Sequence, residues 1–125
     1  MEATYKISVT ARPFYLAEQS NESAEQYTFA YQITITNEGN VPAKLMARHW
    51  VIEDGQGQKQ EVRGLGVVGE HPEIAPGESF EYTSGVTLNA PVGTMYGSYQ
   101  MMAADGTEFE ATIAPFILSM PRTLH

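Results

Sequence analysis

The chain has 125 residues, 42% of them hydrophobic, and contains no cysteine. The length and hydrophobic content are enough for one domain with its own core. The absence of cysteine excludes disulfides, thiolate zinc sites and a cysteine nucleophile. Fifteen acidic residues against seven Lys and Arg give a net charge of -8, which repels nucleic-acid backbones and anionic membranes. We therefore expect no nucleic acid and no membrane among its partners.

The N-terminal residues lack the basic and apolar regions of a signal peptide, and no apolar run approaches the ~20 residues of a membrane span. No shift in composition marks a linker between domains. The sequence thus predicts one cytoplasmic domain that covers residues 1–125, present as a monomer or a weak homodimer.

Alternating apolar and polar residues predict strands in seven segments along the chain. In chain order these are residues 5–11, 26–37, 43–54, 58–63, 78–88, 95–103 and 108–118. The clearest is 26–37, where aromatic and β-branched residues occupy every second position. The segment 18–26 is rich in Glu, Ser, Asn and Gln, which predicts an exposed, mobile loop.

Two of these segments carry further information. The run 43–54 is apolar on both faces, as in a central strand, and holds the single tryptophan, Trp50; the polar run 58–63 that follows it is typical of an edge strand. In 108–118 the apolar parity switches at Pro115, which predicts a β-bulge. Together the segments predict an all-β fold, an immunoglobulin-like or fibronectin type III-like β-sandwich of about seven antiparallel strands.

The glycines Gly64, Gly66 and Gly69 form a G-x-G-x-x-G pattern. A dinucleotide fingerprint of this kind needs a helix directly after the loop, and the following residues do not favour one. We therefore interpret the segment as a glycine-permitted crossover between sheets, with Val67 and Val68 packing beneath it. The alternative, a loop that binds a nucleotide or pyrophosphate, stays open at this point.

The chain has three histidines, His49, His71 and His125, and their spacing fits no metal-binding motif. We expect no dedicated metal site and no cofactor, and interpret His49 as a strand histidine with a hydrogen-bonded neighbour. Ser84 does not lie in a Gly-x-Ser-x-Gly elbow, and no pair of carboxylates is spaced for acid–base work. The sequence predicts that the protein is not an enzyme.

Arg48 shares a strand face with Met46 and Trp50, which predicts a guanidinium on the core side. Such a charge must lie at the end of the sandwich or pair with an acid. We interpret it as a structural ion pair that fixes the strand end, with an anchor for a ligand or peptide carboxylate as the alternative. We interpret three methionines as core filler: Met95, Met101 and Met102.

Several segments, in order along nearly the whole chain, closely resemble the ApaG family, also called CorD. They are residues 27–37, 48–50, 64–72, 76–78, 82–85, 93–99 and 113–116. The resemblance implies a fibronectin type III-like sandwich, and in eukaryotic F-box proteins the domain is thought to bind other proteins. Bacterial members are linked genetically to cobalt resistance and magnesium efflux, and the family brings no agreed catalytic residue.

The resemblance also implies a candidate interaction surface at the family's motif positions. These are Arg48, His49, Gly64, Gly66 and Gly69, to which we add His71, where glutamine is more usual in the family. The prediction is a non-catalytic module that binds another protein and affects divalent cations indirectly. The alternative is a small-molecule sensor that binds a nucleotide or pyrophosphate through the 64–69 loop.

Overall fold

The structure, a computed structural model, describes residues 2–121. Residue 1 and residues 122–125 of the predicted domain range, and with them His125 of the histidine set, lie outside the described residues. Among residues 2–121, no helix is long and apolar enough to cross a membrane.

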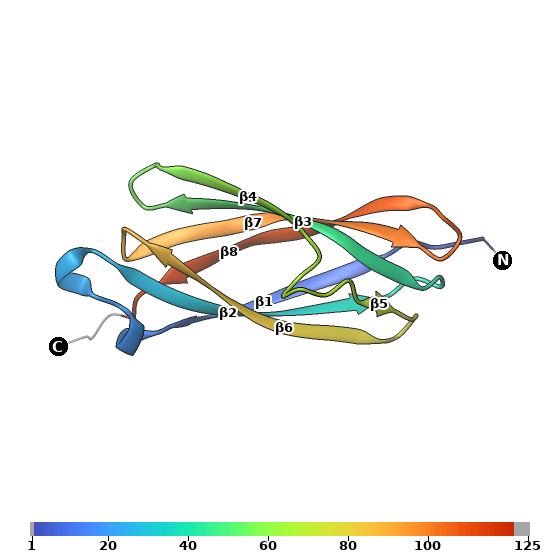
Figure 1. Ribbon diagram of the computed structural model, residues 1–125, viewed down its shortest axis with the longest axis horizontal. Helices are drawn as coiled ribbons and strands as arrows, with labels where there is room; N and C mark the ends of the chain where they lie inside the picture. Colours follow the sequence, from blue (N-terminus) through green and yellow to red (C-terminus); the bar gives the residue numbers. More distant parts are fainter. Residues whose placement is uncertain (1, 122–125) are drawn as a thin grey trace.

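Two antiparallel sheets pack face to face, which confirms the predicted β-sandwich (Figure 1). The strands are β1 Ile7–Tyr15, β2 Tyr27–Asn37, β3 Ala43–Asp54, β4 Lys59–Leu65, β5 Glu73–Ile74, β6 Ser79–Leu88, β7 Val92–Ala103 and β8 Glu108–Ser119. One sheet has the order β1-β2-β6 and the other β4-β3-β7-β8, with β5 pairing with β3. All seven predicted strands exist, and the two-residue strand β5 is the one that the alternation did not reveal.

The polar segment between β1 and β2 is exposed, as expected, but it contains two 3₁₀ turns, Ala17–Gln19 and Glu22–Ala24. The side chain of Asn21 caps the second turn by accepting from the backbone N–H of Ala24. The loop expected before β7 is shorter than predicted, because β7 already begins at Val92, which pairs with Ser119 of β8.

Strand β2 shows why the alternating pattern folds as a sheet. Its inward residues Phe29, Ile33 and Ile35 are buried, and three of its outward positions carry threonine. Thr28 and Thr36 hydrogen-bond across to Thr87 and Ser79 of β6, at 2.9 Å and 2.7 Å. Burial of one face and hydroxyl ladders on the other fix the register of this sheet.

Aromatic rings fill the centre of the core around Trp50, which is 3% exposed. Its ring packs edge-to-face on Tyr31, Tyr99 and Phe116 at centroid distances of 5.5, 6.3 and 5.9 Å. The inward position predicted for Trp50 is therefore confirmed. Phe109 lies at the margin of the core, where it is partly buried and packs against the ring of Tyr5.

β-Bulges keep the apolar residues of two strands on the core side. In β8, Phe116 pairs with Met95 and Ile113 with Gly97, so β8 holds one extra residue at the predicted parity switch beside Pro115. A second bulge, at Met46 of β3, was not predicted. It places Met46 out of step with Arg48 and Trp50, so the face that the sequence assigned to Met46 was wrong.

Candidate functional site

The glycine segment links the two sheets. β4 ends at Leu65 in the five-stranded sheet, and the chain then passes through β5 to β6 in the other sheet (Figure 1). Gly66 has φ +62° and Gly69 has φ +79°, conformations that favour glycine. The backbone N–H groups of Val67 and Glu70 each donate to the other residue's carbonyl at 2.8 Å. The predicted crossover is confirmed.

The two valines of this crossover behave differently. Val67 is 1% exposed and belongs to the core, as predicted. Val68 is 54% exposed and has φ +45°, so the prediction that it packs beneath the loop was wrong. A β-branched residue in the left-handed region is strained. The tight turn closed by Val67 and Glu70 places Val68 at its outer corner, where the side chain points away from the core.

Arg48 ties β3 to the crossover through backbone carbonyls. Its Nη1 donates to the carbonyl oxygens of Leu65 at 3.0 Å and Gly66 at 2.8 Å. No ion pair of Arg48 occurs within residues 2–121, so the expected pairing with an acid was wrong. Two carbonyl dipoles satisfy part of the guanidinium instead.

The absence of a side chain at Gly64 leaves the space that the Arg48 guanidinium occupies. Gly64 lies opposite Arg48 in the β3–β4 pairing, and a Cβ at this position would meet the guanidinium atoms at 2.6–2.8 Å. Its φ is not in the left-handed region. The three glycines therefore serve different purposes: space for Arg48 at Gly64, and backbone conformation at Gly66 and Gly69.

Beside Arg48 lies a pocket of about 270 Å³ at the open seam between β4 and β6. Its lining consists of Tyr31, Arg48, Trp50, Leu65, Val67, Val68, Gly69, Tyr82 and Ser84. The hydroxyls of Tyr82 and Tyr99 hydrogen-bond to each other behind it. Burial raises the pKa of Tyr82 to about 12 and raises that of Tyr99 still further, so both stay neutral at physiological pH.

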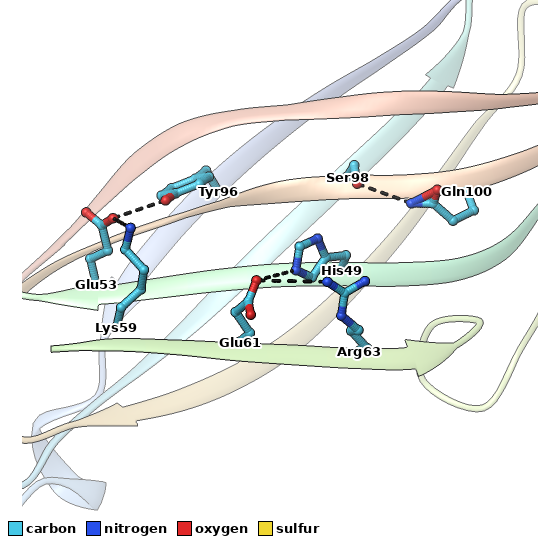
Figure 2. Close-up of polar contacts among 8 residues, drawn as sticks. All are labelled: His49, Glu53, Lys59, Glu61, Arg63, Tyr96, Ser98 and Gln100. Carbon is cyan, nitrogen blue, oxygen red and sulfur yellow. Dashed lines mark hydrogen bonds and ion pairs between the residues drawn. The ribbon is translucent and has the colours of Figure 1, made fainter.

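His49 points to the other face of β3, outside the sandwich, and is therefore separated from Arg48. Its Nε2 lies 3.0 Å from Oε1 of Glu61, which Arg63 approaches at 4.0 Å (Figure 2). The prediction of a strand histidine with a hydrogen-bonded neighbour is confirmed. On the same face Glu53 accepts from Lys59 and Tyr96, and these hydrogen bonds lower the pKa of its carboxyl.

His71 lies beside the crossover and is exposed. Its Nδ1 is 3.2 Å from the carbonyl oxygen of Leu45, and its ring is close to Gly66, where a Cβ would lie 3.3 Å from Cε1. The structure thus brings Arg48, Gly64, Gly66 and His71 together. It places Gly69 at the rim of the Arg48 pocket and His49 on the opposite face of the sheet.

The outer face of the five-stranded sheet is a surface that the sequence analysis missed. Leu65 and Ile117 are 77% and 63% exposed. A depression of about 560 Å³ extends from Leu65 across Ala47 to Gln100 and Glu110, and a second of about 390 Å³ adjoins it between Met46, Met102, Phe109 and Glu108. The detectable signal was apolar residues at outward positions, Leu65 of β4 and Ile117 of β8. The prediction that Met102 is core filler was wrong, whereas Met95 and Met101 are buried.

Chemistry-bearing side chains are dispersed. Within residues 2–121, no group of three or more His, Asp or Glu side chains is placed to hold a metal ion. Ser84 lies in β6 and lines the Arg48 pocket, whose lining, all of it described, contains neither a histidine nor a carboxylate to activate it. The pocket places the Arg48 cation near the hydroxyl-bearing residues Tyr82 and Ser84. The other candidate feature is the broad outer face of the five-stranded sheet.

These features define an immunoglobulin-like β-sandwich with an anchored arginine at its crossover. The ApaG domain profile matches residues 17–103. Protein ApaG of Nitrosospira multiformis is 57% identical over 121 residues, 97% of this chain and 95% of that protein; Protein ApaG of Thiobacillus denitrificans is 59% identical with the same coverage. The crystal structure of an ApaA protein from Bordetella pertussis superposes with a TM-score of 0.92 at 54% identity, covering 95% of this chain and 97% of that one. The chain belongs to the ApaG family, as the sequence motifs predicted.

Proposed function

We propose that the protein is a non-catalytic binding module of the cytoplasm that holds another protein on the outer face of its five-stranded sheet. The observation that carries this proposal is the difference between its two outer faces. The β1-β2-β6 face presents threonine and serine ladders, and its exposed apolar residue Phe14 of β1 is 44% exposed against 77% for Leu65. The β4-β3-β7-β8 face combines strongly exposed Leu65 with two adjoining depressions. Exposed apolar side chains beside a depression are typical of interaction surfaces.

The edge strand β4 is the part of this face best suited to a partner. It pairs with β3 on one side only, so its other side offers backbone groups to an added strand. Lys59, Glu61 and Arg63 alternate along it, which protects the edge from indiscriminate pairing. Leu65 at its end gives an extended segment an apolar contact.

The charges of the second depression indicate the chemistry of the partner. Glu108 and Glu110 line it, both are exposed, and neither forms an ion pair with another described residue. The whole chain carries a net charge of -8. We therefore propose a partner segment that combines an apolar side chain with Lys or Arg. The effect on cobalt and magnesium that the family resemblance implies would then pass through this partner, with no metal held by the module itself.

A nucleotide or pyrophosphate on the 64–69 loop is the weaker candidate. A dinucleotide site needs a helix N-terminus after the glycines, whereas here the two-residue strand β5 follows. Nothing in the geometry of this loop favours a polyphosphate over a protein partner.

Affinity capture from the cells that make the protein, with matched surface variants, tests the proposal. Leu65→Ser and Glu110→Lys change the proposed surface, and Phe14→Ser and Glu81→Lys make the same changes on the opposite sheet. We expect a protein that wild type and both control variants retain and that the two outer-face variants lose. The purified partner should then bind at least about tenfold more weakly to Glu110→Lys. Capture that is equal for all four variants, or no captured protein, would contradict the proposal.

A further inference from the structure

The pocket beside Arg48 has a polar lining and a cation whose hydrogen bonding is incomplete. Of the guanidinium nitrogens, Nη1 donates to Leu65 and Gly66. Nε and Nη2 make no hydrogen bond to any residue in the range 2–121, and no buried side-chain nitrogen or oxygen of these residues lacks a partner. The remaining N–H groups of Arg48 are therefore not sealed from solvent, and Arg48 lines the pocket of about 270 Å³.

The position of this cation is fixed before any ligand arrives. Two carbonyls hold Nη1, and Gly64 lets the guanidinium lie against the backbone of β4. A side chain that is already held loses little conformational entropy when it binds. The Ser84 hydroxyl lines the same pocket as a further donor.

The charge around Arg48 favours an incoming anion. No carboxylate lines the pocket, and Arg48 has no ion-pair partner among residues 2–121. The acceptors of Arg48 are neutral carbonyls, so no carboxylate among these residues offsets its positive charge. The pocket thus holds a positive charge although the whole chain has a net charge of -8.

We propose that this pocket is a binding site for a single carboxylate group. The two free N–H directions of a guanidinium match the two oxygens of a carboxylate. A phosphate fits less well, because one arginine offsets only part of a dianion, no lysine lines the pocket, and the net charge of the chain opposes a second negative charge. The carboxylate belongs either to a small free acid or to the C-terminus of a peptide.

This site and the proposed outer-face surface meet at Arg48 and Leu65, which line both the pocket and the larger outer depression. Glu110 lines the outer depressions and not the pocket. Glu110→Lys should therefore weaken binding of the protein partner and leave carboxylate binding unchanged, which makes the two failures distinguishable.

Trp50 provides the readout, because it is the single tryptophan and lines the pocket. Its fluorescence is followed while acetate, N-acetylglycine, N-acetylglycinamide or inorganic phosphate is added at constant ionic strength. We expect saturable changes with both carboxylates at millimolar concentrations, and none with the neutral amide. N-acetylglycine binding more tightly than acetate indicates a peptide C-terminus, and the reverse order indicates a small free acid.

Variants of Val68 give a matched test that avoids disturbing Arg48. Val68 is exposed at the pocket with φ +45°, a conformation that Asp and Asn adopt more readily than valine. Val68→Asp adds a carboxylate to the lining of the pocket and should weaken N-acetylglycine binding at least about tenfold, while Val68→Asn should leave it intact. Arg48→Lys should also weaken it, and Arg63→Lys should not.

The proposal is overturned by any of three results. One is no saturable response to either carboxylate up to about 100 mM. Another is phosphate binding more tightly than the carboxylates. The third is equal binding of N-acetylglycine by Val68→Asp and Val68→Asn.

Discussion

Replacing Gly66 by alanine separates a structural role of the glycine loop from a ligand-binding role. Gly66 has φ +62°, so alanine there costs on the order of 1 kcal/mol in backbone strain. The new Cβ would also overlap the carbonyl oxygen of Glu70 and lie 3.0 Å from its carbon. That carbonyl accepts the N–H of Val67 at 2.8 Å, and losing this bond costs about another 1 kcal/mol. We expect Gly66→Ala to lower the free energy of unfolding by about 2–3 kcal/mol.

Gly69→Ala is the matched control within the same loop. Gly69 has φ +79°, but a Cβ there would meet no atom within 4 Å, so only the strain of about 1 kcal/mol applies. Urea unfolding, followed by the fluorescence of Trp50, measures both variants against wild type. If the two variants lose the same free energy to within about 0.5 kcal/mol, the reasoning from the Glu70 contact is refuted.

The same variants test the nucleotide alternative. We expect no rise in melting temperature when ATP or diadenosine tetraphosphate is added to wild type, since any ligand that binds the folded state must raise it. A rise in wild type that Gly66→Ala abolishes, without a loss of stability, would restore the phosphate-binding interpretation of the 64–69 loop.

Two further predictions concern the core. Gly97→Ala should abolish the cooperative fold, because its Cβ would overlap the carbonyl oxygen of His49 and lie 3.1 Å from Cα of Trp50, both in the adjacent backbone of β3; native near-UV circular dichroism in this variant would contradict it. The raised pKa of Tyr82, about 12 against an ordinary value of 10.0, means that the unfolded chain releases this proton first as pH rises. The contribution of neutral Tyr82 to the free energy of unfolding is therefore fully present below about pH 10. It is lost as the pH rises toward 12, and the loss amounts to at most about 3 kcal/mol. Unfolding free energies across this range should fall less steeply for Tyr82→Phe, and an unchanged slope would refute the assignment.

The strands could be predicted because most of them bury one face and expose the other. Period two then follows directly from the pleat, as in β2. The bulge in β8 was also visible, because Pro115 marks the parity switch. The bulge at Met46 of β3 carries no such marker, and a strand that is apolar on both faces hides a change of parity. The two-residue strand β5 depends on β3 for its pairing and leaves no pattern of its own.

The candidate site was predictable in its residues but not in its geometry. Parity placed Arg48 on the core side, which is correct, and the physical need for a partner was also correct. The expected carboxylate partner was wrong, because the acceptors are the backbone carbonyls of Leu65 and Gly66. Their direction is set by a backbone turn with positive φ, which the sequence indicates only as a set of glycines. His49 and Arg48 are neighbours in sequence, and a strand necessarily sends them to opposite faces.

The hydrogen-bond polarity of the 64–69 segment explains why its glycine pattern does not make a phosphate cradle. A phosphate needs several free backbone N–H groups that point at one spot. Here the N–H of Gly66 donates to the carbonyl of Met46 at 2.9 Å, and that of Val67 donates to Glu70. The carbonyls of Leu65 and Gly66, meanwhile, point at Arg48. The backbone of the loop thus presents acceptors to a cation, the reverse of what an anion requires. The free side of the Arg48 side chain is the cationic group that an anion meets here, and the amides of Gly66, Val67 and Glu70 are already used in hydrogen bonds within the protein.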